Sequence, residues 1–162
     1  MDDIIYTTTY ASPIGNIVIG SDGKALVGLW FCEQKYFLGK YKEFKADDSL
    51  KIFNETKCWL REYFKSNNPQ ITMKLAPSGT EFQQKVWKEL EKIPYGKTVT
   101  YGDIGKKLGI KSGQAIGGAV GRNPISIIIP CHRVLGKNNS LTGYAGGIDK
   151  KLMLLKLENA VG

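Results

Sequence analysis

The chain has 162 residues, of which 42% are hydrophobic and 23% are charged, as is usual for one globular domain or two small ones. No apolar run approaches the ~20 residues of a membrane span, and the start of the chain lacks the positive flank and apolar stretch of a secretory signal, so we expect no membrane association and a cytoplasmic location. With three cysteines and a single histidine, none at metal-ligand spacing, we expect neither a disulfide framework nor a metal site.

The whole chain has a formal net charge of +8, and most of the excess positive charge lies in its second half. A Pro-Ser-Gly stretch beginning at Pro77 is typical of a linker. Residues 1–77 carry 10 Lys/Arg and 9 Asp/Glu, whereas residues 78–162 carry 13 and 6. We therefore predict two domains, 1–77 and 78–162. The second is expected to meet a polyanion such as nucleic acid, although a basic surface can also serve solubility alone.

Residues 4–31 have the pattern of a small antiparallel sheet. Runs of β-branched and aromatic residues are separated by turn signals at Ser12-Pro13 and Ser21-Asp22-Gly23. Residues 50–65 then place apolar side chains at helical spacing, and Asn67-Asn68-Pro69 ends the pattern. We expect this helix to cover the sheet.

Residues 78–162 have mainly helical patterns. The run Thr80–Gln83 is typical of a capping box and begins a helix that ends before Pro94. Two short helices follow, Asp103–Leu108 and about 112–121, around a turn that contains Gly109. This arrangement in a basic domain favours a helix-turn-helix of the winged-helix kind. A sheet-and-helix first domain and a mostly helical second domain give an α+β fold class.

The second of these short helices is unusual because Ala115, Gly117, Gly118 and Ala119 offer almost no side chain. Glycine destabilises a helix, so the small residues indicate that something comes close to this backbone. A tight contact with another helix and a close approach to a DNA groove explain the pattern equally well.

The run Pro130-Cys131-His132-Arg133 follows an apolar segment, Ser126–Ile129, that has the pattern of a buried strand. A cysteine at the end of a strand is well placed to react, and basic neighbours favour the nucleophilic thiolate. A lone cysteine after an apolar run is also a common core residue.

Three further residues accompany the cysteine in this half of the chain. Glu158, on a helix predicted from about Asp149, is a candidate partner for the second imidazole nitrogen of His132, which would then act on the thiol through a water molecule. Asn123 precedes a proline, and Tyr144 belongs to a glycine-rich loop that could close over a flat ligand. Each residue also has an interpretation without catalysis: Glu158 as a surface carboxylate, Asn123 as a turn residue and Tyr144 as part of a connecting loop.

Together these residues resemble the O6-alkylguanine-DNA alkyltransferase (methylated-DNA–protein-cysteine methyltransferase) family. The resemblance extends from Thr80 to Glu158 and rests on Tyr101, the small-residue helix, Gly121-Arg122-Asn123-Pro124, Ile129-Pro130-Cys131-His132-Arg133-Val134 and Tyr144-Ala145-Gly146-Gly147. It implies that residues 1–77 form a ribonuclease-H-like domain and that residues 78–162 bind DNA and perform the transfer.

The resemblance also implies a role for each candidate. Cys131 attacks the alkyl carbon of a guanine flipped out of the DNA stack, His132 with Glu158 takes the thiol proton through water, Asn123 orders the pocket, and Tyr144 hydrogen-bonds the base and stabilises the departing guanine. The other implied contacts are Tyr101 against the target phosphate, Gly117 and Gly118 at the minor groove, Val120 in the pocket wall, and backbone groups of Cys131, Val134 and Ala145 on the base edges.

The implied reaction is a direct, single-turnover transfer from O6-alkylguanine in double-stranded DNA, with O4-alkylthymine as a second candidate substrate. The thioether that forms has no good leaving group, so each molecule is consumed by one lesion. No cofactor is required, and we expect a monomer.

One position departs from the family pattern. The family usually has Arg-Ala-Val-Gly, with the arginine filling the gap left by the flipped base, where this chain has Gln114-Ala115-Ile116-Gly117. Glutamine lacks the charge and the planar stacking surface of arginine, which predicts less efficient base flipping. Lys111 or Arg122 could compensate.

Two other functions compete with alkyl transfer. A non-enzymatic protein that binds alkyl lesions would keep the DNA-binding helix and replace the nucleophile, which the intact Pro-Cys-His-Arg run disfavours. A Cys-His hydrolase would need a histidine facing the sulfur and an oxyanion hole, and adjacent Cys131 and His132 make that geometry awkward.

Overall fold

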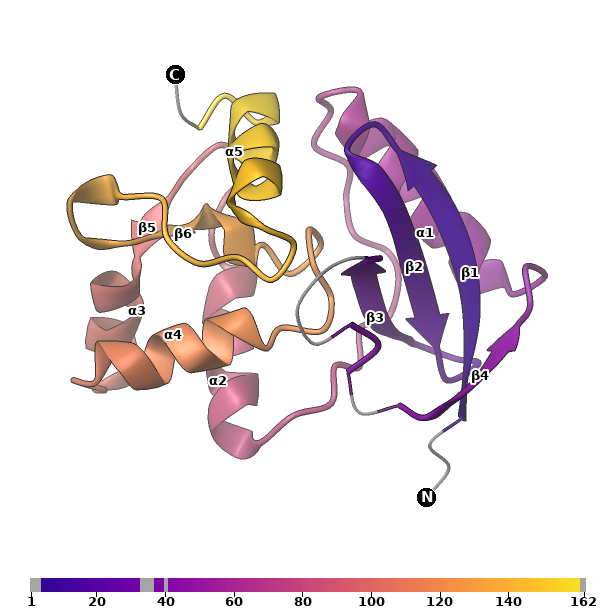
Figure 1. Ribbon diagram of the computed structural model, residues 1–162, viewed down its shortest axis with the longest axis horizontal. Helices are drawn as coiled ribbons and strands as arrows, with labels where there is room; N and C mark the ends of the chain where they lie inside the picture. Colours follow the sequence, from indigo (N-terminus) through magenta and orange to yellow (C-terminus); the bar gives the residue numbers. More distant parts are fainter. Residues whose placement is uncertain (1–3, 33–36, 40, 161–162) are drawn as a thin grey trace.

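The computed structural model describes residues 4–32, 37–39 and 41–160, so the start of the chain, where the lack of a secretory signal was predicted, lies outside the described residues. In chain order the elements are β1 (Ile4–Ser12), β2 (Gly15–Ser21), β3 (Leu26–Phe31), β4 (Glu43–Ala46), α1 (Lys51–Phe64), α2 (Glu81–Glu91), β5 (Val99–Thr100), α3 (Tyr101–Leu108), α4 (Gly113–Gly121), η1 (Cys131–Arg133), β6 (Val134–Leu135), η2 (Lys137–Asn139) and α5 (Ile148–Leu157). Figure 1 shows the sheet and α1 on one side and the remaining helices on the other, which confirms the predicted α+β class.

The first half of the chain forms a four-stranded sheet with the order β3-β2-β1-β4. The hairpin of β1 and β2 and the pair β2-β3 are antiparallel, as predicted, but β4 is parallel to β1, so the sheet is mixed. The sequence did not indicate β4 because all four of its residues are exposed, and the strand therefore lacks the apolar alternation that marks a half-buried strand.

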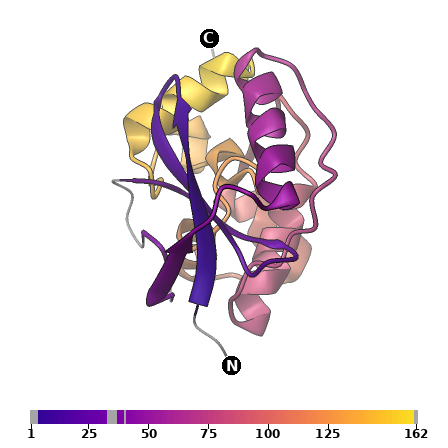
Figure 2. The ribbon, with the colours of Figure 1, turned by 90° about the vertical axis from the view of Figure 1, so that its right-hand side faces the viewer.

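One hydrophobic core joins the two halves of the chain. It contains buried residues of β2, β3 and all five α-helices together with the segment 125–134. Two segments also hydrogen-bond to the backbone of β3: Leu26 N–H donates to Lys74 O (2.8 Å), and Leu29 N–H donates to Pro124 O (2.8 Å). The segment that leads to Cys131 is thus attached directly to the sheet, while α1 covers the sheet on one face (Figure 2).

Local signals define the helices of the second half. The capping box of α2 is present in full, since Gln83 N–H donates to Thr80 Oγ1 (3.1 Å) and Thr80 N–H donates to Gln83 Oε1 (2.9 Å). Gly109 ends α3 with a φ of 70°, a left-handed conformation that glycine adopts without strain. The short turn that follows leads into α4, as the predicted helix-turn-helix requires (Figure 1).

The strand predicted at Ser126–Ile129 does not form. The segment is buried, as expected, but it is a tight turn in which Ile127 has a φ of 71°, and only Ile125 makes a bridge to the sheet, at Leu29. The turn is stabilised by the Asn123 side chain, which accepts from Ile125 N–H (3.0 Å) and donates to Ile129 O (2.8 Å). A side-chain amide here satisfies the backbone groups that a neighbouring strand would otherwise satisfy.

Within the described residues, no helix combines the length and the hydrophobicity needed to cross a bilayer.

Candidate active site

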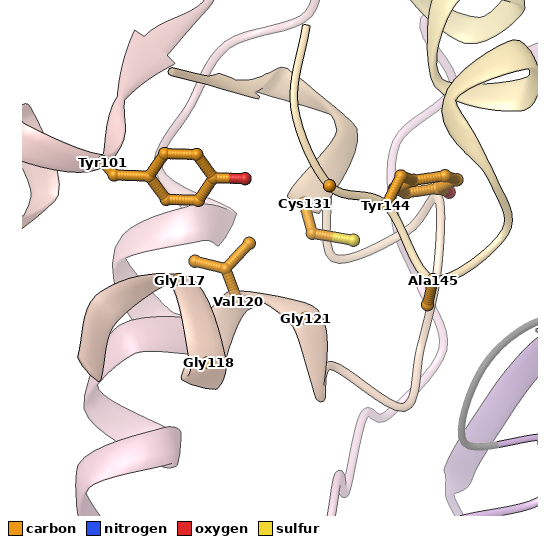
Figure 3. A pocket seen from close by; sticks show the side chains of 9 residues that line it. Tyr101, Gly117, Gly118, Val120, Gly121, Cys131, Tyr144 and Ala145 are labelled. Carbon is orange, nitrogen blue, oxygen red and sulfur yellow. The ribbon is translucent and has the colours of Figure 1, made fainter. Parts of the chain in front are cut away.

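Cys131 opens into a small pocket in the second half of the chain. The pocket has a volume of about 280 Å³ and is lined by Tyr101 at the start of α3, by Gly117, Gly118, Val120 and Gly121 of α4, and by Gly143, Tyr144 and Ala145 of the loop before α5. Figure 3 shows the Cys131 sulfur between the Tyr144 ring and α4, with the Tyr101 hydroxyl pointing toward it. Three separate segments therefore surround one thiol.

The thiol of Cys131 is a weaker acid than the sequence suggested. Burial raises its pKa above the ordinary value, while a hydrogen bond with Asn123 and the charge of Lys151 act in the opposite direction without cancelling the effect of burial. The prediction that His132 and Arg133 would stabilise the thiolate is wrong, because both side chains turn toward Glu158 instead. A base near the thiol would therefore promote formation of the thiolate.

Lys151 supplies a positive charge close to the thiol. Its side chain is fully buried, and its ammonium donates to the backbone oxygens of Thr142 (2.7 Å) and Gly143 (3.2 Å). Burial lowers the pKa of Lys151 to about 8, and interaction with Cys131 works in the opposite direction. Lys151 therefore both anchors the loop that forms one wall of the pocket and stabilises a thiolate at Cys131.

Glu158 is the centre of a buried hydrogen-bond network behind the pocket. Its Oε2 atom accepts from Tyr63 Oη (2.5 Å), lies 2.7 Å from His132 Nε2 and accepts from Arg133 Nη2 (3.1 Å), while Oε1 accepts from Arg133 Nε (2.8 Å) and Gly96 N–H (3.1 Å). Burial alone raises the pKa of Glu158, but these donors outweigh burial and hold the pKa well below its ordinary value. Glu158 is therefore an ionised carboxylate.

The ionised carboxylate determines which nitrogen of His132 carries the proton. A carboxylate only accepts hydrogen bonds, so Nε2 must be the donor, and Nδ1 of the neutral ring is the basic nitrogen. Burial lowers the pKa of His132, and the hydrogen bond with Glu158 only partly opposes this effect, so the ring is neutral at neutral pH. Within the described part of the chain, Nδ1 is buried and has no hydrogen-bond partner.

The glycines of α4 are not required by internal packing. A Cβ atom added at Gly113, Gly117, Gly118 or Gly121 would meet no atom within 4 Å. Within the described residues, a tight contact with another helix therefore does not explain these glycines. Ala119 is different, because it is buried and its backbone oxygen accepts from Trp87 Nε1 of α2 (2.9 Å). The small residues leave an open strip of helix surface beside the pocket.

The predicted site residues fall into three groups. Tyr101, Gly117, Gly118, Val120, Tyr144 and Ala145 line the pocket with Cys131, while Asn123, His132 and Glu158 lie behind it. Gln114 is exposed on the first turn of α4 and does not line the pocket. Arg122 lines a different cavity, between the two halves of the chain, and Val134 is fully buried in β6, beside the site.

Sequence reasoning missed Tyr63 and Lys151. Tyr63 belongs to the apolar face of α1 and is indistinguishable by spacing from a core residue, although a buried phenol needs a hydrogen-bond partner and this need was a usable signal. Lys151 is one of two consecutive lysines, and only the folded loop shows which of them is buried.

Comparison with known proteins shows the family of the chain. The model of the 6-O-methylguanine DNA methyltransferase ribonuclease-like domain matches residues 5–77, and the model of the DNA-binding domain of the same proteins matches residues 81–160. The chain therefore belongs to the 6-O-methylguanine DNA methyltransferase family, as its motifs predicted.

Individual relatives match over nearly the whole chain. The methylated-DNA–protein-cysteine methyltransferase of Methanosarcina acetivorans is 44% identical over 161 residues, which cover 96% of this chain and 99% of the relative. The protein of the same name from Haemophilus influenzae is 40% identical, with 95% and 86% covered. The crystal structure of Mycobacterium tuberculosis OGT in complex with DNA has a TM-score of 0.87 at 39% identity and covers 96% of this chain and 93% of that one.

Proposed function

We propose that this protein repairs DNA by transferring the alkyl group of O6-alkylguanine directly to Cys131, once per molecule. The observation that carries the proposal is a cysteine thiol that opens into a small pocket and is backed by a histidine with a free basic nitrogen. Near-full-length similarity to methylated-DNA–protein-cysteine methyltransferases supports the same reaction.

The residues around the pocket have the chemistry that the transfer needs. Sulfur forms a bond to the alkyl carbon while the carbon–O6 bond breaks and leaves its electron pair on guanine. The thiol proton passes through a water molecule to Nδ1 of His132, and Glu158 stabilises the imidazolium that results. Burial raises the pKa of Tyr144 well above its ordinary value, so this phenol stays protonated and donates a hydrogen bond to the departing guanine.

The open strip of α4 is proposed to lie against the minor groove of duplex DNA, where the absence of side chains at Gly117 and Gly118 allows a close approach. The damaged base enters the pocket by flipping, which costs a few kcal/mol and is easier for a weakly paired lesion. Tyr101, at the pocket edge, presses on the target phosphate, and Gln114 occupies the position from which the gap in the stack is filled. We propose that residues 78–162 perform these steps and that the protein acts as a monomer.

The decisive experiment is a single-turnover reaction with a duplex oligonucleotide that carries O6-methylguanine. Peptide mapping by mass spectrometry should find one methyl group, on the peptide that contains Cys131, and Cys131→Ser should abolish the transfer. Cys32 and Cys58 are exposed and serve as internal controls, because neither should gain a methyl group. Binding without transfer would instead indicate a lesion-binding protein, and several methyl groups removed per molecule would contradict the single-use mechanism.

A further inference from the structure

Tyr63 connects the first half of the chain to the residues proposed to deprotonate Cys131. It lies in the last turn of α1, is 1% exposed, and places its hydroxyl 2.5 Å from Glu158 Oε2 and 3.5 Å from His132 Nε2. Tyr63 thus supplies a hydrogen bond from α1 to this network. The contact therefore joins the ribonuclease-like half to the transfer chemistry.

The direction of the hydrogen bond follows from the two partners. Glu158 is ionised, because Arg133 donates to both of its oxygens, and an ionised carboxylate can only accept. Burial raises the pKa of Tyr63 far above its ordinary value, so the phenol keeps its proton. Tyr63 is therefore the donor, and the bond is charge-assisted.

The ring that carries this hydroxyl is held in place on several sides. It stacks on Trp59 with centroids 5.2 Å apart and an interplanar angle of 10°, and it makes edge-to-face contacts with Phe64 (5.4 Å) and Tyr95 (6.2 Å). Glu158, in contrast, follows the last residue of α5 and occupies the C-cap position. The hydroxyl of Tyr63, which is fixed by packing in α1, thus restrains the carboxylate of Glu158. The backbone at the end of a helix restrains a residue less than the backbone in its interior.

We propose that Tyr63 is a positioning residue for alkyl transfer, which holds Glu158 so that His132 keeps its proton on Nε2 and offers Nδ1 to the thiol. This inference rests on the proposed function, because it assigns Tyr63 a part in the same proton relay. It gives the first half of the chain a contribution to the chemistry that does not involve contact with DNA or with the damaged base.

The test compares Tyr63→Phe with Tyr10→Phe, which removes a hydroxyl from a half-buried tyrosine elsewhere on the same core. Alkylation of Cys131 by free O6-benzylguanine is measured under single-turnover conditions across a range of pH, so that DNA binding and base flipping do not contribute. We expect Tyr63→Phe to react about tenfold more slowly at neutral pH, because it loses one hydrogen bond to the carboxylate. A tenfold change lies at the low end of what a hydrogen bond to a charged group contributes. The deficit should shrink at high pH, where the thiol ionises without a base. Tyr10→Phe should stay within about twofold of the unmodified protein.

A second readout separates positioning from general damage to the fold. His132 is the only histidine of the chain, so the ¹⁵N resonances of its ring identify the protonated nitrogen without assignment. The unmodified protein should carry the proton on Nε2, and Tyr63→Phe should show a mixture of the two tautomers. Loss of folding alone would be visible in the remaining resonances.

Three results would overturn the inference: an unchanged rate and tautomer in Tyr63→Phe, a deficit that is the same at every pH, or an equal deficit when Tyr63→Phe is placed in a Glu158→Gln background. If Tyr63 acts through Glu158, the double variant should be no slower than Glu158→Gln alone. Failure of the unmodified protein to transfer a benzyl group to Cys131 would contradict the proposed function itself, which distinguishes that outcome from the failure of the Tyr63 assignment.

Discussion

Replacing Glu158 by glutamine tests how strongly the buried network stabilises the fold. The substitution keeps the size of the side chain but removes its charge. It also places an amide group where Tyr63, His132 and Arg133 donate hydrogen bonds to the carboxylate. Both carboxylate oxygens are buried, and the Arg133 side chain is only 11% exposed, so a buried cation loses its partner. Breaking such a pair costs about 3–5 kcal/mol, which corresponds to a fall in Tm of about 6–20 °C for a chain of this length.

The assay is urea unfolding followed by tryptophan fluorescence, with thermal unfolding in parallel. Glu81→Gln is the matched control, because its ion pair with Lys85 is exposed and its loss should cost less than about 1 kcal/mol. Arg133→Met should also cost less in the Glu158→Gln background than in the unmodified protein, since the charge that it removes has already lost its partner. A loss from Glu158→Gln no larger than that of Glu81→Gln would refute the energetic role of the network.

Three further outcomes are expected. Gly118→Ala should raise the unfolding free energy by about 0.5–1 kcal/mol, because the added methyl meets no atom. The same substitution should weaken binding to duplex DNA in a titration, and tighter binding would contradict the placement of α4. Gln114→Arg should speed repair of duplex DNA relative to reaction with free O6-benzylguanine, and an unchanged ratio would refute the role given to Gln114. Lys151→Met should raise the pKa of Cys131 and slow its alkylation most below about pH 8, because above this pH Lys151 itself loses its charge. A slowdown independent of pH would count against stabilisation of the thiolate by Lys151.

The parts of the fold that were predicted correctly depend on local signals. The capping box at Thr80, the glycine that ends α3 and the turns between the first strands are short patterns whose physical effect acts within a few residues. The apolar run at Ser126–Ile129 shows the limit of such reasoning. Its burial followed from composition, but its conformation depends on the side chain of Asn123, which competes with strand pairing.

The residues of the candidate site were likewise only partly predictable from local signals. Cys131, His132 and Glu158 could be nominated from motifs, but the direction of the shift in the pKa of Cys131 could not, because burial depends on segments far apart in the chain. Tyr63 and Glu158 are 95 residues apart in sequence, and no periodicity in either helix indicates that they meet. Long-range polar contacts of this kind appear only when the whole chain is folded.

The burial of the Cys131 thiol also affects how long an unused molecule survives. Oxidants and soft electrophiles attack thiolates, and they reach exposed thiols first. Cys131 is 5% exposed and its pKa is raised, whereas Cys32 and Cys58 lie on the surface. A protein whose nucleophile is consumed by its first reaction loses its function if that reaction is with a stray electrophile. Under the proposed mechanism, the pocket therefore protects the thiol from such electrophiles until a damaged base enters.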